Sequence, residues 1–161
     1  MRAGNLDRRS FLAGSLALAA TALAPSRAAR AAASDLDFAS ALDVARAIRS
    51  GQVSAVELTT RMLDRIQQHN GKLNAIVTLA ADAVERARAA DEARARRDWW
   101  GPFHGVPCTI KDTFEVAGVT TTAGSPALRN HVPARDAAVA ARLRAAGMVV
   151  LGKTNVPLFA A

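Results

Sequence analysis

The sequence predicts an α/β fold in which helices cover a β-sheet. Helical and strand patterns alternate along the chain, which is typical of this fold class. The helices are indicated by capping residues followed by apolar residues three or four positions apart. The strands are indicated by short apolar runs that end at glycine or polar residues. Half of the 161 residues are hydrophobic, which is enough for a packed core.

Two helices are predicted in succession. The first begins after Ser40, which has an acidic residue at capping-box spacing, and it ends at Gly51. The second begins after the capping box of Ser54 and is expected to end at Asn70-Gly71, because both residues tolerate left-handed backbone. We expect these two helices to form an antiparallel pair.

A strand and a third helix are predicted next. Residues 73–79 alternate between apolar and less apolar side chains, which is the period of a half-buried strand. Residues 80–97 are rich in alanine, arginine and glutamate and predict a helix. The charged face of this helix is interpreted as a solvated surface with pairs such as Asp91 and Arg94.

The second half of the chain continues the alternation. Residues 106–110 predict a short apolar strand that has Lys111 at its end, and a polar, threonine-rich loop follows. Residues 136–146 then predict a helix. Residues 148–151 predict a buried strand, and Gly152 is expected to form the turn that leaves it.

The segment from Gly147 to Thr154 matches the letters of the phosphate-binding P-loop. A working P-loop follows a strand and opens a helix, so that its backbone amides surround the phosphates. Here a predicted helix comes before Gly147, and the four middle residues are large and apolar. We therefore interpret the middle residues as a buried strand and do not expect nucleotide binding.

The charge of the chain does not indicate a nucleic-acid-binding protein. The net charge is +7, but residues 1–33 carry much of it, and basic and acidic residues alternate in the remainder. The single cysteine, Cys108, cannot form an internal disulfide. The longest apolar run, residues 11–24, is shorter than the ~20 residues that span a bilayer, so we expect no stable membrane insertion.

Residues 1–33 have the three parts of a signal peptide. A basic start precedes the apolar run at 11–24, and small residues at 31–33 suit a signal peptidase, so we expect cleavage after Ala33. The run at 7–12, DRRSFL, resembles the twin-arginine export signal. An ordinary secretory leader is the alternative. Both interpretations predict a periplasmic or secreted protein.

Lys111 is the candidate catalytic residue. A lysine considered alone is most simply a solvated surface residue. Lys111, however, follows an apolar strand, and burial there would disfavour the charged ammonium. A neutral amine can accept a proton from a hydroxyl, so this setting favours a general base.

The surroundings of Lys111 resemble a known family. Residues 101–112, GPFHGVPCTIKD, resemble the segment that carries the catalytic lysine in amidase signature enzymes. Further stretches agree in order and spacing at residues 118–125, 136–147 and 152–155. The resemblance covers about residues 38–161, so residues 34–161 are interpreted as the N-terminal part of an amidase domain.

The resemblance implies hydrolysis of a carbon–nitrogen amide bond on a single α/β domain with a mixed sheet. A serine–cis-serine–lysine triad performs this reaction in the family, with Lys111 as the residue that takes the proton from the bridging serine. The family's two serines lie in a Gly-Gly-Ser-Ser-Gly-like segment that does not occur before Ala161. We therefore expect residues 34–161 alone to be inactive and their sheet to be incomplete.

The substrate and the role of the chain have alternatives. Members of the family act on free, peptide, fatty acid and cyclic amides or on glutamine, and export argues against glutamine. Leu158 departs from the glutamate of many members, which leaves the subgroup open. The resemblance implies no cofactor. The competing hypothesis is a catalytically inactive relic, or an exported binding or structural module.

Other candidate catalytic groups have weaker support. Cys108 and His104 could form a thiol–imidazole pair, but Pro107 lies between them and a lone buried cysteine is usually a small apolar residue. Ser125 lacks the glycines of a nucleophile elbow. The histidines are spread out without a close second ligand, so no metal site is expected; they are His69, His104 and His131.

Overall fold

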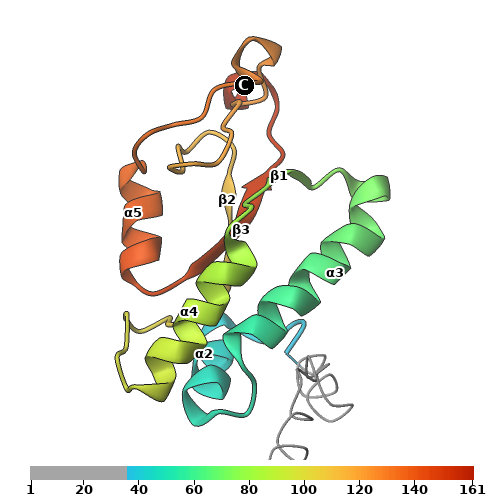
Figure 1. The fold of residues 1–161 in the computed structure, drawn as a ribbon. Helices are drawn as coiled ribbons and strands as arrows, with labels where there is room; N and C mark the ends of the chain where they lie inside the picture. The colour runs from blue at the N-terminus through green and yellow to red at the C-terminus, as the bar shows by residue number, and fades with distance from the viewer. Residues whose placement is uncertain (1–35) are drawn as a thin grey trace, which may run out of the picture.

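The computed structural model describes residues 36–161 (Figure 1). The signal peptide predicted at residues 1–33 lies outside the described residues. The helices are α2 (Ala41–Ser50), α3 (Ala55–Leu73), α4 (Ala83–Ala95) and α5 (Ala138–Ala145), with short 3₁₀ turns η1 (Pro126–Leu128) and η2 (Leu158–Ala160). The strands are β1 (Ile76–Leu79), β2 (Pro107–Lys111) and β3 (Val149–Thr154). No described helix is long and apolar enough to cross a membrane.

The three strands form one mixed sheet in the order β1-β3-β2. The central strand β3 pairs with β2 in parallel and with β1 in antiparallel orientation. The register of β2 and β3 shifts after Cys108, so that Ile110 lies beside Lys153 and Lys111 beside Thr154. The predicted α/β class and the mixed sheet implied by the resemblance are both confirmed.

Helices lie on both sides of this sheet, with α5 on one side and α3 on the other (Figure 1). On the α5 side, Ala140 and Leu143 pack with Val150 in one core cluster. The α3 helix packs against α4, whose buried alanines permit close approach. The expected antiparallel pairing of α2 with α3 is wrong, since α2 instead packs in a cluster that reaches only the start of α3, at Leu58.

The predicted starts of α2 and α3 are confirmed, because capping is a local interaction. The Ser40 hydroxyl accepts a hydrogen bond from the Asp43 backbone N–H. A complete capping box joins Ser54 and Glu57 at the start of α3. Gly51 ends α2 in the left-handed conformation that the sequence indicated.

The predicted end of α3 at Asn70-Gly71 is wrong. The helix continues to Leu73, and Asn74 takes the left-handed position that closes it. The side chain of Asn70 is used elsewhere, since it bonds both the N–H and the carbonyl of Ile76. These bonds start β1 at Ile76, three residues later than the predicted strand.

The interpretation of Asp91 as a solvated residue paired with Arg94 is also wrong. Its carboxylate accepts hydrogen bonds from the backbone N–H groups of Ala55 and Val56, at 2.8 and 3.0 Å. These groups belong to the first turn of α3, which has no internal partners for them. Asp91 of α4 therefore caps α3 and joins the two helices.

Candidate active site around Lys111

Lys111 is the last residue of β2, and its side chain is exposed. The preceding residue Ile110 is buried, because successive strand residues point to opposite faces of the sheet. The expected apolar setting of the Lys111 amine is therefore not formed by the described residues. The apolar strand buries Ile110 and leaves Lys111 on an open face.

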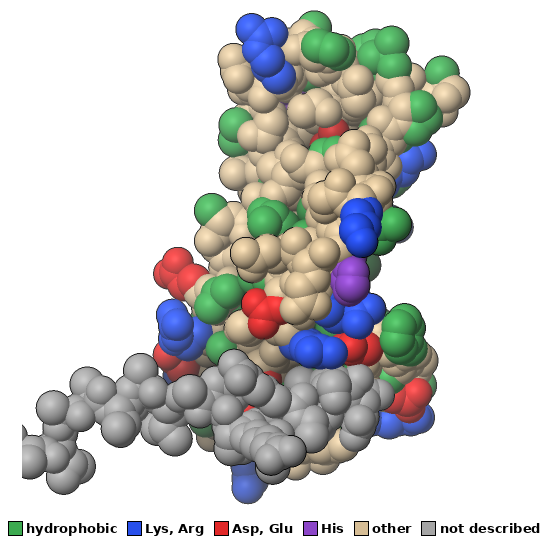
Figure 2. All heavy atoms as spheres, turned by 90° about the vertical axis from the view of Figure 1, so that its right-hand side faces the viewer, with side chains coloured by type: hydrophobic (Ala, Val, Ile, Leu, Met, Phe, Trp, Pro, Cys, Tyr) green, Lys and Arg blue, Asp and Glu red, His purple; other side chains and the backbone are tan. Residues whose placement is uncertain are grey.

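This open face borders an apolar groove with a volume of about 480 Å³. Thr109, two residues before Lys111 on the same face of β2, lines the groove. The other lining residues are Met62, Arg65, Ile66, His69, Asn70, Leu73, Ala75, Ile76 and Leu151. Figure 2 views the molecule from the α3 side, where hydrophobic side chains lie scattered among charged ones. A groove of this size can accept a small ligand or the side chains of another protein segment.

On the opposite face, Asp112 is completely buried directly after Lys111. Its carboxylate accepts hydrogen bonds from the hydroxyl and the backbone N–H of Thr122. Its backbone N–H donates to the Thr154 carbonyl at 3.1 Å, and its carbonyl accepts from the Ala123 N–H at 3.0 Å. Both the backbone and the side chain that follow Lys111 are therefore fixed.

Lys153 of β3 lies beside Asp112 and is also completely buried. Its Nζ is 3.3 Å from Asp112 Oδ1 and donates to the Phe114 carbonyl at 2.7 Å and to Thr121 Oγ1 at 2.8 Å. Burial lowers the pKa of the Lys153 ammonium, and the charge of Asp112 opposes this shift. The pair is a buried ion pair with its hydrogen-bonding groups satisfied.

The segment that contains Lys153 does not have the conformation of a P-loop. Residues Val149–Thr154 form a strand that is buried almost throughout, with no turn that could surround a phosphate. The interpretation of the middle residues of this motif as a buried strand is confirmed. The expected turn at Gly152 is wrong, because Gly152 lies inside the strand and pairs with Leu79 and Thr109.

His104 has a structural role. Its Nδ1 accepts from the Trp100 backbone N–H at 3.1 Å, and its Nε2 lies 2.9 Å from the Ala90 carbonyl, which only accepts. The ring is buried and contacts Trp99 and Trp100 edge-on. Both nitrogens are therefore occupied by backbone groups and cannot activate a nucleophile.

The remaining nucleophile candidates lack a base. Burial raises the pKa of the Cys108 thiol to about 11, and no hydrogen bond joins it to His104 within the described residues. Ser125 is buried before η1, and no hydrogen bond in this part of the chain joins its hydroxyl to a lysine or histidine. His131 is paired with Glu115 at 2.9 Å. Across residues 36–161, no three His, Cys, Asp or Glu side chains are grouped as metal ligands would be.

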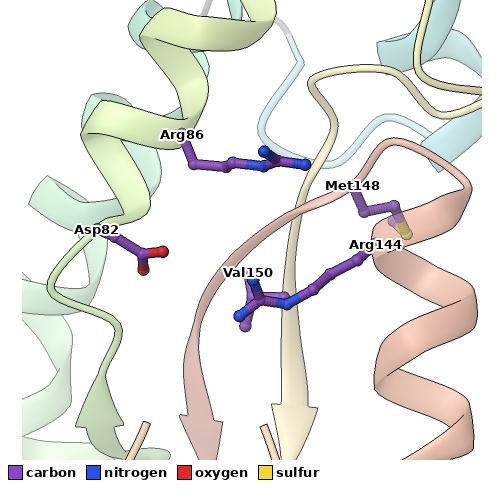
Figure 3. Close-up of a pocket in the computed structure, with 5 residues that line it drawn as sticks. All are labelled: Asp82, Arg86, Arg144, Met148 and Val150. Atoms are coloured by element: carbon purple, nitrogen blue, oxygen red, sulfur yellow. The ribbon is translucent and has the colours of Figure 1, made fainter. Parts of the chain in front are cut away.

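Figure 3 shows a second, much smaller pocket between α4, β3 and α5. Its lining residues are Asp82, Arg86, Arg144, Met148 and Val150. Its volume of about 10 Å³ has room for no more than one water molecule. The groove that Thr109 lines is therefore the larger candidate binding surface.

Comparisons with known proteins agree with this fold. Residues 57–161 match the Amidase family. The chain is 44% identical over 126 residues to a glutamyl-tRNA(Gln) amidotransferase subunit of Bdellovibrio bacteriovorus, covering 78% of this chain and 26% of that protein. It is 44% identical over 121 residues to the indoleacetamide hydrolase of Bradyrhizobium diazoefficiens, covering 74% and 23%. The peptide amidase of Stenotrophomonas maltophilia superposes with a TM-score of 0.74 at 35% identity, covering 77% and 26%.

The similar proteins are an amidotransferase subunit, an indoleacetamide hydrolase and a peptide amidase, so the fold and sequence relate this chain to a class of amide-processing enzymes. The chain belongs to the amidase signature family. It spans about a quarter of the length of the curated relatives it matches.

Two charged residues of the site were given no role by the sequence. The sequence shows Asp112 only as the residue after Lys111. It shows Lys153 only as part of the segment that matches the letters of the P-loop. The expected turn at Gly152 put Lys153 outside the predicted strand, whereas Lys153 is a charged residue of β3. Such a residue requires a buried partner, but its partner is distant in the sequence.

Proposed function

We propose that this chain forms the first part of an amidase domain that hydrolyses a carbon–nitrogen amide bond, with Lys111 as the general base. The proposal is supported by family membership and by the match of the Lys111 segment to the family's lysine motif. It is also supported by the position of Lys111 at the end of a strand, where the following residue is fixed.

In this mechanism the neutral amine of Lys111 takes a proton from a bridging serine. The bridging serine then takes the proton of the nucleophilic serine, which attacks the amide carbonyl. The amine portion of the substrate then leaves with a proton that Lys111 returns through the same relay, and an acyl-enzyme remains. Water then hydrolyses the acyl-enzyme. Both serines would be supplied from outside residues 1–161.

The observation that carries this proposal is the open face of the sheet. Lys111 and Thr109 share that face, and an apolar groove borders it. A further protein segment that covers this face would remove water from Lys111, which would favour the neutral amine. On the opposite face of the sheet, Asp112 and Lys153 are completely buried.

We further propose that the substrate is a small-molecule or peptide amide that is met outside the cytoplasm. Residues 1–33 support export by a twin-arginine-type signal. Among the similar proteins, an indoleacetamide hydrolase and a peptide amidase act on amides of these two classes, as their names state. A role in amidation of tRNA does not fit export.

The first test is to read the coding sequence beyond the codon for Ala161. The complete reading frame is then expressed and assayed for ammonia or amine release from simple amides and peptide amides. A glycine-serine segment in the frame and measurable turnover are expected. A frame that stops after Ala161, with no turnover, would instead support the inactive relic or the binding module.

The second test addresses the base directly. Lys111→Ala in the complete protein is expected to lower kcat by at least about 10³-fold, because a triad without its base loses most of its rate. Lys72→Ala is the matched control, since Lys72 is another exposed lysine on the last turn of α3 and should leave kcat unchanged. Turnover like that of the wild type in Lys111→Ala would refute the assignment.

A further inference from the structure

Lys153 differs from the other lysines of the chain in its surroundings. The sequence contains three lysines, and Lys72 and Lys111 are exposed. Lys153 has 0% exposure, although it carries an ammonium that would be solvated elsewhere. Completely buried lysines are rare in proteins unless a specific partner holds them.

The partners of Lys153 all come from one segment, which begins directly after Lys111. An ammonium has three N–H donors, and three oxygens surround this one. They are Asp112 Oδ1, the Phe114 carbonyl and Thr121 Oγ1. The chain that leaves Lys111 is therefore folded back onto β3 and attached to Lys153.

Stability alone does not account for a charge at this position. Replacing a buried ion pair by well-packed uncharged residues is often neutral or stabilising, because both charges lose their hydration on burial. A methionine would fill the same volume on β3 without that cost. Only the ion pair supplies an interaction that fixes the orientation of the Asp112 carboxylate.

Fixing the orientation of the Asp112 side chain also fixes the direction of the Lys111 side chain. Neighbouring residues in an extended chain point to opposite faces, so the orientation of Asp112 determines the direction in which Lys111 projects. The Asp112 N–H extends the ladder to Thr154, and its carboxylate is fixed by Thr122 as well as by Lys153. A rotation at Asp112 would move the Lys111 amine away from the open face.

We propose that Lys153 is a positioning residue for the amidase reaction, acting on the Lys111 amine through the buried Asp112 carboxylate. This inference rests on the proposed function of Lys111. The Lys153–Asp112 pair also adds no net charge beside Lys111. Of the other charged groups, Glu115 is the carboxylate whose field reaches Lys153, and it is itself paired with His131.

The experiment uses the complete reading frame that contains this chain. The variants are Lys153→Met, Asp112→Asn and the double variant, with Lys72→Met as the matched control. We expect each of the three variants to lower kcat by about 10- to 100-fold with little change in KM, because a base displaced by about an ångström loses most of its effect. Lys72→Met should keep wild-type kinetics.

The pH profile gives a readout that a purely structural role would not move. Lys153→Met leaves a lone carboxylate beside Lys111, which favours the protonated amine, so half-maximal kcat should move to higher pH. Asp112→Asn leaves a lone ammonium, so half-maximal kcat should move to lower pH. Each shift is expected to be on the order of half a pH unit, and the double variant should return toward the wild-type midpoint.

A second measurement covers variants that fold poorly or a reading frame that has no activity. In the double variant, hydrogen exchange at the amides of Asp112 and Ala123 should be at least about 10-fold faster than in Lys72→Met. Thr121→Val removes one oxygen from Lys153 but no charge, and it should accelerate the same amides to a smaller extent. Unchanged exchange at both amides in the double variant would overturn the inference, whether or not the protein is active.

The kinetic outcomes separate this inference from the proposed function. If Lys111→Ala is inactive while Lys153→Met keeps the wild-type kcat and pH midpoint, the inference fails and the proposed function stands. If Lys111→Ala is fully active, the proposed function fails, and the role of Lys153 in the reaction fails with it. Both the proposed function and the inference are supported if Lys111→Ala is inactive and if Lys153→Met and Asp112→Asn lower kcat and shift its pH midpoint in opposite directions.

Discussion

Gly152 of β3 lies directly against the backbone of Thr78 in β1. A Cβ atom on residue 152 would clash with the Thr78 carbonyl oxygen and would come 3.0 Å from Leu79 Cα. Because both neighbours are backbone atoms, they cannot move aside without disturbing the antiparallel pairing of the two strands. The missing side chain at residue 152 therefore allows β1 to join the sheet.

Gly152→Ala is expected to destabilise the fold by about 1–3 kcal/mol, because the strands must separate to admit the methyl group. Urea unfolding followed by circular dichroism measures this change. Gly71→Ala is the matched control, since a Cβ at Gly71 inside α3 meets no atom within 4 Å. The control should be stabilised by up to about 1 kcal/mol. Equal unfolding free energies for the two variants would contradict the close approach at Gly152.

The features that were predictable from the sequence are those that depend on near neighbours. The capping box of Ser54 and the helix end at Gly51 involve residues within one helical turn, so the sequence pattern alone contains them. The apolar strand before Lys111 was likewise visible as a short run. The position of Lys111 at the end of that strand followed from the same pattern.

The features that were not predictable depend on residues far apart in the chain. The close approach that requires glycine at position 152 comes from β1, so the sequence alone suggested a turn. Asn70 was expected to end a helix, but its side chain bonds the backbone of Ile76 instead. The exposure of Lys111 depends on what covers one face of the sheet, which no local pattern of apolar residues specifies.

Asp91→Ala is expected to lower the unfolding free energy by about 1–2 kcal/mol. The Asp91 carboxylate binds two N–H groups at the start of α3, and a negative charge there also interacts favourably with the helix dipole. Glu92→Ala removes an exposed carboxylate from the same helix and should change stability by no more than about 0.5 kcal/mol. Thermal or urea unfolding of the two variants compares them directly. A loss in Glu92→Ala as large as that in Asp91→Ala would show that the cap contributes nothing specific.

Cys108 is expected to react slowly with iodoacetamide in the folded protein. Burial raises the pKa of its thiol to about 11, so the reactive thiolate is scarce at pH 8. Mass spectrometry should show labelling at least about 10-fold slower than in the same chain in urea. A Cys108→Ala/Gln67→Cys variant, which places the thiol at an exposed position of α3, should react at the rate of a free thiol. Equally fast labelling of the two folded proteins would argue that Cys108 is accessible and ionised.

Asp37 is expected to make the stability of the chain fall in acid. Its side chain is 7% exposed and binds Arg61 and Arg65 at 2.8 and 2.7 Å. The hydrogen bond from Arg61 is the main cause that lowers the pKa of Asp37 below its ordinary value of 3.8, and the charges of both arginines add to it. The stabilisation from the ionised carboxylate is therefore fully present above pH 3.8. It is lost as the pH falls below this value and through the lowered pKa of the folded state.

Asp37→Asn is expected to lower the unfolding free energy at pH 7 by about 1 kcal/mol, because both arginines remain partly exposed and solvent screens them. The difference in unfolding free energy between the wild type and this variant should shrink as the pH falls from 5 to 2. Protonation of Asp37 in the wild type removes the same charge that the substitution removes. Asp98→Asn, at an exposed position, should follow the wild-type curve throughout. Urea midpoints measured at several pH values give these curves. A constant difference between Asp37→Asn and the wild type down to pH 2 would mean that the ionised carboxylate is not the source of the stabilisation.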